Sequence, residues 1–293
     1  MQEVLETIDI ESFDSHLSSE IKQKAIHTLE QGKVVYFPKL TFKLNADELR
    51  FLSHEMVDPK SKNISYDVNN DKLAGTTCKD LDAQKMKEMI RRYALQSRSF
   101  MEKLFPIYTP NLNQARTSFR PVEIAGRKSS YRKDDTLLHV DSFPATPVKG
   151  RRIMRFFTNV NPNGQARVWK LGEPFPNVVQ KFGEKLKKPI PGLAWLLKSI
   201  GVTKDYRTLY DHYMMHMHDM MKGDKDYQKN VTQYEIKFPP GSTWIVFTDQ
   251  ASHAALSGQH VLEQTYYLPV EGLDNPETAP LRILERFYGQ KLV

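Results

Sequence analysis

The sequence has little cysteine: Cys78 is the single one among 293 residues. One cysteine excludes an intramolecular disulfide framework and agrees with a reducing compartment. Long hydrophobic runs are also missing, and without 18 consecutive apolar residues no transmembrane helix is expected. The first residues are acidic and no apolar run follows them, so no secretory signal is visible. These absences together predict a cytoplasmic protein.

Acidic residues are fewer than basic ones, because 35 Asp and Glu stand against 42 Lys and Arg, a net charge of +7. The excess weakly favours an anionic partner, and nucleic acid, an anionic membrane and a phosphorylated glycolipid would each qualify. Zinc-finger, KH and RRM signatures are missing, and the aromatic residues are spread along the predicted strands. We therefore expect no nucleic acid partner.

Helical patterns occupy much of the first hundred residues. A helix is predicted from about residue 18 to 30, ended by Gly32, and a second helix is predicted to start at Asn45. A long amphipathic helix is predicted over 82–105, because its apolar residues follow the 3.6-residue period. The polar segment 58–77 between them is predicted to be a loop. We expect the helices to support a sheet.

Strand patterns dominate from residue 114 onwards. Predicted strands cover 114–121, 137–141, 152–160, 166–169 and 234–238, with two more around Trp244 and Tyr266. The sequence between 177 and 230 is instead helical and rich in Lys and Met. Strands on both sides of a helical segment indicate one β domain with an insertion. We expect an α+β protein with a mainly β core, made of N-terminal helices and a strand (1–113), the core (114–176 and 231–272) and a helical insert (177–230).

His139 and Asp141 form an H-x-D motif on one predicted strand. Because side chains alternate along a strand, both point to the same face and can bind one metal ion. A third candidate ligand, His253, follows a later strand that starts after a Pro-Gly turn. Two histidines and one carboxylate form the facial triad that holds non-haem Fe(II) and leaves positions open for an organic acid and dioxygen. A tetrahedral zinc hydrolase is the competing interpretation.

Further stretches accompany this triad: Gly32–Pro38, Arg116–Pro121, Arg132–Asp135 ahead of His139–Pro144, and Phe157–Pro162. Together with the order of the segments they resemble the Kdo (3-deoxy-D-manno-octulosonic acid) hydroxylases, within the Fe(II)- and 2-oxoglutarate-dependent oxygenases. The resemblance implies a double-stranded β-helix, which is a cupin-like jelly roll. It also implies Fe(II), with 2-oxoglutarate and dioxygen as co-substrates.

The resemblance further implies roles and a reaction. His139, Asp141 and His253 would be the metal ligands and the catalytic residues. The reaction would hydroxylate C3 of the outer Kdo sugar of lipopolysaccharide, or of a lipid A precursor, to give the talo-octulosonic analogue, Ko. Two alternatives stay open: an oxygenase of another carbohydrate or of a protein, and a non-catalytic jelly-roll binding protein. The oligomeric state is open as well.

The sequence offers several candidates for the residue that binds the far carboxylate of 2-oxoglutarate. Many such oxygenases carry Arg or Lys about ten residues after the distal histidine. Gln264 stands at this place and is expected to be a co-substrate residue with Arg155 and Arg116, although it cannot form an ion pair. A buried dicarboxylate needs a cation. Arg155 is our first candidate, because its strand parity places it on the face expected to line the barrel. Arg116 and Arg120 are the runners-up, with Arg127 further back. Replacing Arg155 by Ala is predicted to raise the 2-oxoglutarate requirement more than it weakens iron binding.

Two features of the helical insert have more than one interpretation. His212, His216 and His218 have a spacing that a second metal could use, but the glutamate of metalloprotease motifs is missing, so a Met-rich buried face is favoured. The stretch 182–198 combines lysines and leucines with Trp195. That composition suits either a solvated helix edge or peripheral contact with an anionic membrane such as the inner membrane.

Overall fold

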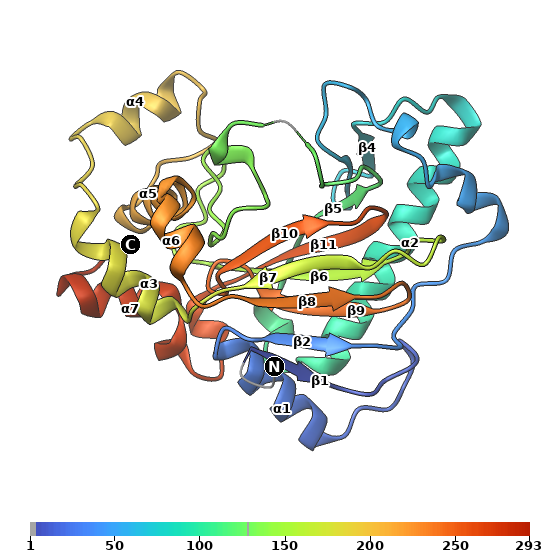
Figure 1. The fold of residues 1–293 in the computed structure, drawn as a ribbon, viewed down its shortest axis with the longest axis horizontal. Coiled ribbons are helices and arrows are strands. Elements are labelled where there is room, and N and C mark those ends of the chain that lie inside the picture. Colours follow the sequence, from blue (N-terminus) through green and yellow to red (C-terminus); the bar gives the residue numbers. More distant parts are fainter. Residues whose placement is uncertain (1–3, 128) are drawn as a thin grey trace.

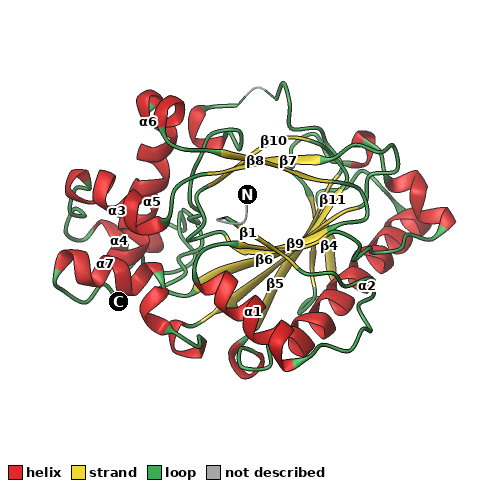
Figure 2. Cartoon of the chain, turned by 60° about the horizontal axis from the view of Figure 1, so that its bottom comes forward, coloured by secondary structure: helices red, strands yellow, loops and turns green. Residues whose placement is uncertain are grey.

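The computed structural model describes residues 4–127 and 129–293. Two β-sheets face each other in a jelly roll (Figure 1), with strand orders β1-β2-β9-β6-β11-β5-β3-β4 and β10-β7-β8. Figure 2 shows the smaller sheet on one side and the larger sheet on the other, with α1 and α2 against the outer face of the larger sheet. This confirms the predicted α+β class with a mainly β core.

The strands of both sheets pair antiparallel, apart from β1 and β2, which run parallel. The larger sheet consists of β1 (Leu5–Thr7), β2 (Val34–Phe37), β3 (Ile64–Asp67), β4 (Lys72–Ala74), β5 (Asn113–Arg120), β6 (Arg152–Asn159), β9 (Thr243–Phe247) and β11 (Val261–Leu268). The smaller sheet consists of β7 (Arg167–Leu171), β8 (Tyr234–Phe238) and β10 (His253–Ser257).

The helices fall into two groups. The first group supports the larger sheet and consists of α1 (Ser19–Glu30) and α2 (Asp80–Leu104). The second group lies beyond one end of the sheets (Figure 1) and consists of α3 (Phe175–Phe182), α4 (Leu193–Ser199), α5 (Leu209–Gly223), α6 (Lys225–Asn230) and α7 (Pro280–Tyr288). Short 3-10 helices include η1 (Ala46–Phe51), η2 (His54–Met56) and η4 (Tyr131–Lys133).

Successive side chains of β6 point to opposite faces of the larger sheet. Phe156 points to the helices and packs near Phe100 of α2, with ring centroids 6.1 Å apart. Phe157, the next residue, points between the sheets and contacts Trp169 and Trp244, with centroids 5.1 Å away in both cases. The aromatic layer between the sheets therefore closes one end of the space in which Arg155, on the same face as Phe157, lies.

The predicted helices at α1 and α2 are confirmed, with ends within two residues of the predicted ones. Two predictions for the segments between these helices are wrong. The region starting at Asn45 forms η1 and η2 and no α-helix. The second of these begins at a new turn, where the Ser53 hydroxyl accepts from the Glu55 N–H. The polar segment 58–77 contains the β3–β4 hairpin. Its turn is stabilised by the Asp67 carboxylate, which accepts from the N–H of Asn69 and of Asn70.

The segment predicted as a strand over 137–141 is also corrected. It makes only an isolated bridge to the smaller sheet, in which His139 and His253 exchange backbone hydrogen bonds of 3.0 and 2.9 Å. On the preceding residue, the Gln228 amide of α6 takes the place of a neighbouring strand. It accepts from the Leu138 N–H at 2.8 Å and donates to the Leu138 carbonyl at 2.9 Å.

Candidate metal centre

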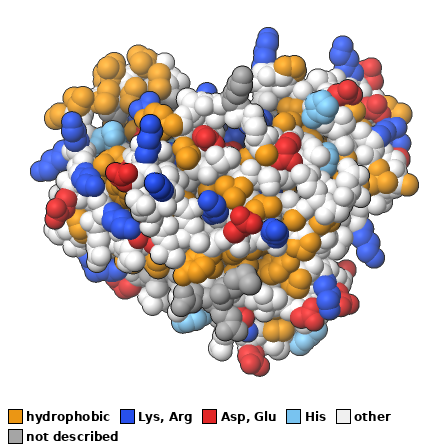
Figure 3. Space-filling model, in the orientation of Figure 1, with side chains coloured by type: hydrophobic (Ala, Val, Ile, Leu, Met, Phe, Trp, Pro, Cys, Tyr) orange, Lys and Arg blue, Asp and Glu red, His pale blue; other side chains and the backbone are white. Residues whose placement is uncertain are grey.

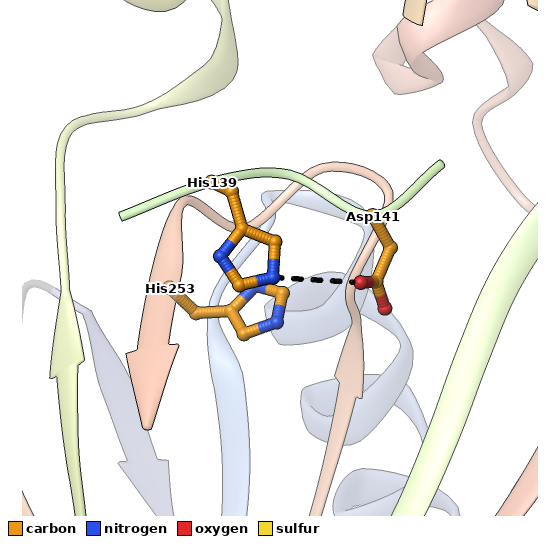
Figure 4. Close-up of side chains that lie close together, drawn as sticks. All are labelled: His139, Asp141 and His253. Carbon is orange, nitrogen blue, oxygen red and sulfur yellow. Dashed lines mark ion pairs between the residues drawn. The ribbon is translucent and has the colours of Figure 1, made fainter. Parts of the chain in front are cut away.

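The structure brings His139, Asp141 and His253 together at the mouth of the jelly roll. Each offers one ligand atom, and these atoms all lie within 4.8 Å of one another. Figure 4 shows His139 and Asp141 projecting from one segment and His253 approaching from the start of β10. The backbone bridge between residues 139 and 253 fixes this approach. Among the described residues, this is the one group of three such side chains close enough to hold a metal ion.

Both imidazoles are oriented by a backbone carbonyl two residues earlier in the chain. Nδ1 of His139 lies 2.8 Å from the Leu137 oxygen, and Nδ1 of His253 lies 2.8 Å from the Ala251 oxygen. A carbonyl only accepts, so each Nδ1 carries the proton and each Nε2 keeps a lone pair. Histidine ligands of metals use this arrangement. The donor set therefore fits a divalent metal ion.

Burial keeps the two imidazoles neutral. It lowers the pKa of His139 well below its usual value, and the neighbouring His253 lowers it further. Burial also lowers the pKa of His253, with a partial opposing effect from Asp141. A metal ion binds only the neutral imidazole, so the site is prepared for binding without a prior loss of protons.

Asp141 belongs to a buried chain of charges. Its carboxylate lies 2.8 Å from Nη2 of Arg155, whose Nη1 lies 2.6 Å from Glu263, and Glu263 also pairs with Arg120 at 2.6 Å. Burial alone would raise the pKa of Asp141, but the charge of Arg155 outweighs it and lowers this pKa. The same holds for Glu263, where Arg120 and Arg155 overcome the effect of burial. Both carboxylates are therefore ionised.

A cavity of about 430 Å³ opens beside the triad. Three carboxylates line it, those of Asp135, Asp141 and Glu263. Seven cationic side chains line it as well: Lys62, Arg120, Arg132, Lys133, Arg155, Arg167 and Lys222. The excess of positive charge suits anionic ligands, because charges in a desolvated cleft act strongly on what enters it.

Arg167 differs from the other arginines of the cavity, because it has no ion pair with a carboxylate in the described parts of the chain. Its Nη1 donates to the Gly258 carbonyl at 2.7 Å, and its Nε has no hydrogen-bond partner among the described residues. Burial lowers the pKa of Arg167 to about 9, and the nearby Arg120 adds to this shift. A buried guanidinium without a counter-ion is costly, so a bound carboxylate would stabilise it. This geometry fits the far carboxylate of a dicarboxylic acid.

The predicted co-substrate residues take different places. Arg155 and the runner-up Arg120 line the cavity, and the parity argument for Arg155 is confirmed in that it shares the cavity face with Phe157. Gln264 does not reach the cavity, because its amide lies between strands and bonds to Thr117 at 2.6 Å. Arg116 is exposed and lies outside the cavity lining.

Sequence reasoning did not assign Arg167, His218 or Lys222 to the site, and all three line the cavity. Strand parity could have found Arg167, since it stands two residues before Trp169 on the same predicted strand. His218 and Lys222 carry no such signal, because only the tertiary packing of α5 brings them to the cavity. His218 belongs to the trio considered for a second metal, but its ring centroid lies 5.2 Å from that of His139. No second metal group is found in the described chain.

Comparisons with known proteins agree with the geometry of this site. The family model described as 3-deoxy-D-manno-oct-2-ulosonic acid (Kdo) hydroxylase matches residues 12–291. A crystal structure of the Kdo hydroxylase KdoO with α-ketoglutarate and Fe(III) is 48% identical, with a TM-score of 0.96, and the match covers 99% of this chain and 97% of that one. The apo structure of KdoO is 49% identical, with a TM-score of 0.97 and the same coverage.

A third KdoO structure, in complex with succinate and Fe(III), is 49% identical with a TM-score of 0.95, again over 99% of this chain and 97% of that one. The printed description of these structures is a non-heme Fe(II) α-ketoglutarate-dependent dioxygenase. A search among curated proteins finds no match.

Proposed function

The chain belongs to the Kdo hydroxylase family of Fe(II)- and 2-oxoglutarate-dependent dioxygenases, and from this premise we propose the reaction and the residues that perform it. The substrate is a Kdo-containing lipopolysaccharide or lipid A precursor, and C3 of the outer Kdo is hydroxylated to give Ko. The observation that carries this proposal is the convergence of His139, Asp141 and His253 at a cationic cavity.

The three ligand residues have distinct duties in this proposal. His139 and His253 would hold Fe(II) through Nε2, since each Nδ1 is committed to a backbone carbonyl. Asp141 would add a charged oxygen ligand, and Arg155 keeps this carboxylate ionised and directed into the cavity. The bound metal and co-substrate supply the oxidising chemistry. The protein binds, orients and excludes water.

For 2-oxoglutarate we propose Arg167 as the partner of the far carboxylate, with Arg120 beside it. This is supported by the missing counter-ion of Arg167, whereas Arg155 is already paired with Asp141 and Glu263. The assignment of Arg155 from the sequence stays a prediction that competes with this one. Gln264 and Arg116 lie outside the cavity lining, so the geometry gives them no support as co-substrate residues.

The direct test measures succinate and the mass of the lipid together. The protein is incubated with Fe(II), 2-oxoglutarate and dioxygen, with and without a Kdo-bearing lipid, and a mass gain of one oxygen on the lipid is expected. His253→Ala should abolish turnover and Co(II) binding, while His16→Ala, at an exposed histidine, should change neither. Succinate without a mass gain on the lipid would point to another substrate. Full activity in His253→Ala would overturn the metal centre itself.

We also propose that the helical insert makes peripheral contact with an anionic bilayer. The side chains around α4 are unusually exposed, with Trp195 at 61%, Ile200 at 62% and Ile190 at 68%. In Figure 3 apolar side chains gather over α4 at the upper left, with basic side chains beside them. The exposed Lys187 and Lys188 precede them in the chain. Apolar side chains flanked by lysines match the interface of an anionic membrane. None of the described helices has the length and apolar content needed to cross one.

This contact is tested by co-sedimentation with vesicles. Binding to phosphatidylglycerol vesicles should exceed binding to phosphatidylcholine vesicles, and Trp195→Ser should weaken it. Leu81→Ser, at an equally exposed leucine of α2 (63%), serves as the matched control. Equal binding to both lipids would contradict the proposal. Self-association without vesicles that Trp195→Ser abolishes would assign the patch to contacts between copies of the chain.

A further inference from the structure

The cavity holds more positive charge than the metal and co-substrate account for. Seven cationic side chains face three carboxylates there. A ferrous ion and the 2-oxoglutarate dianion would cancel each other's charge, so the protein's own excess of cations would remain. Uncompensated charge in a buried site is costly, and a second anionic ligand would offset it.

The cations divide by the elements that carry them. Arg120, Arg155 and Arg167 lie on β5, β6 and β7, inside the barrel. The other four come from outside the barrel strands: Lys62 from the segment before β3, Arg132 and Lys133 from η4, and Lys222 from α5. The inner group suits the co-substrate, so the outer group is available to the substrate.

Lys222 stands out in the outer group. Its residue surface is only 4% exposed, and its Nζ donates to the Arg132 carbonyl at 3.1 Å. No carboxylate of the described chain forms an ion pair with it. By contrast, Lys62 is paired with Asp135 at 2.7 Å, and Arg132 with Asp219 at 2.9 Å. Lys222 is therefore a buried amine that lines the cavity without a direct ion pair, although the carboxylates of Asp135 and Asp141 lie near enough to favour its charged form.

Helix α5 places this amine close to the metal centre. His218 lies one helical turn before Lys222, so both side chains share one face of the helix. The His218 ring contacts the His139 ring edge-on, and both α5 residues line the cavity. An anion held by Lys222 would therefore lie beside the position where the triad directs its ligand atoms.

We propose that Lys222 binds the carboxylate of the sugar-acid substrate and thereby orients the sugar toward the metal centre. This inference rests on the proposed function and deepens it, because it assigns the recognition of the acid group to one residue. A phosphate on the same lipid offers similar chemistry, so the experiment must separate the two anions.

The kinetic arm compares Lys222→Met with the wild type. Loss of a charge-assisted hydrogen bond is expected to raise KM for the Kdo-bearing lipid about ten- to a hundredfold. KM for 2-oxoglutarate should change much less than KM for the lipid, because the inner arginines and not Lys222 are assigned to that co-substrate. Lys222→Arg should retain part of the affinity, and Lys229→Met, at an exposed lysine of α6, should behave as the wild type. An unchanged lipid KM in Lys222→Met would overturn the proposal.

The binding arm does not depend on turnover and separates this proposal from the proposed function. Calorimetry with Co(II) and 2-oxoglutarate compares free Kdo, which carries no phosphate, with an analogue whose carboxylate is reduced to an alcohol. The wild type should prefer Kdo, and Lys222→Met should lose that preference. If the wild type binds both equally, or if only inorganic phosphate competes, Lys222 is not a carboxylate site. Should Lys222→Met fail to fold, the wild-type preference and Lys222→Arg decide.

If the wild type binds Kdo through its carboxylate but does not oxidise the lipid, the proposed reaction is contradicted and the carboxylate site at Lys222 is still supported.

Discussion

At the scale of single residues, hydrogen bonds to backbone carbonyls orient the histidines of the candidate metal centre. Each histidine uses the carbonyl two residues before it to hold its Nδ1 proton, at Leu137 and at Ala251. The free Nε2 atoms then face Asp141, and ring contacts add to this positioning, since Trp169 stacks on His253 with centroids 5.2 Å apart. A hydrogen bond from the ring nitrogen that does not bind the metal fixes the tautomer as well as the ring orientation.

The triad could be predicted from the sequence because its geometry is local. Two residues on one extended segment face the same way, and this alternation needs no knowledge of the rest of the fold. The cations of the cavity could not be ranked in the same way. Arg155 and Arg167 both have the right parity, and what distinguishes them is that Glu263, far along the sequence but on the neighbouring strand β11, pairs with Arg155.

Arg167→Met is predicted to raise KM for 2-oxoglutarate about ten- to a hundredfold, because the far carboxylate would lose a charge-assisted pair. Co(II) affinity should stay near that of the wild type, since Arg167 contacts none of the three ligand residues. Initial rates at varied 2-oxoglutarate and a Co(II) titration measure both quantities. Lys170→Met, on the opposite face of β7, is the control. If Arg155→Ala shows the larger KM and Arg167→Met does not, the earlier assignment of Arg155 holds.

At the scale of elements, the long helices were predictable and the short connections were not. The 25-residue helix α2 buries a continuous apolar stripe, so its period is visible in the sequence. The segment around His139 is decided by contacts from elsewhere. Residue 139 pairs with β10, and the Gln228 amide of α6 satisfies both backbone groups of Leu138. A side chain from the helical insert therefore completes the position of the metal segment.

Gln228→Ala should loosen this segment. It would leave the N–H and carbonyl of Leu138 without these partners, at a cost of about 1–3 kcal/mol for each group that stays buried and unpaired. Because His139 is the next residue, Co(II) affinity is expected to fall about tenfold or more. Metal titration and urea unfolding measure the two effects. Gln84→Ala, at an exposed glutamine of α2, should change neither. Wild-type metal affinity in Gln228→Ala would show that the β10 bridge alone holds the segment.

At the scale of the whole molecule, folding buries histidines that must stay neutral. His139 and His253 are each 6% exposed and His260 is 3% exposed. Burial lowers the pKa of all three, and for His139 the neighbouring His253 adds to the effect. In the unfolded chain these imidazoles titrate near 6.5. Below that pH the unfolded state binds more protons than the folded state, so stability must fall as the pH falls.

The buried carboxylates affect the folding stability at lower pH than the histidines do. Asp141 and Glu263 have lowered pKa values despite their burial, because Arg155 lies beside both. Their contribution is fully present above the unfolded pKa values of about 4 and is lost as the pH falls below them. Between pH 6.5 and 5 the histidines therefore dominate the slope. Measurements in this pH range therefore report on the buried histidines and not on the carboxylates.

The unfolding free energy of the metal-free protein is predicted to fall below pH 6.5, by at most roughly 1.4 kcal/mol per pH unit for each buried histidine. His260→Asn should reduce this slope, since it removes one of three such groups. Asparagine suits the position, because His260 has a φ of 58°, which asparagine tolerates well. Urea unfolding at several pH values between 5 and 7.5 measures the slope, with His16→Asn as the exposed control. A slope that His260→Asn leaves unchanged would mean that His260 takes up its proton equally in both states, so that its burial does not bear on acid stability.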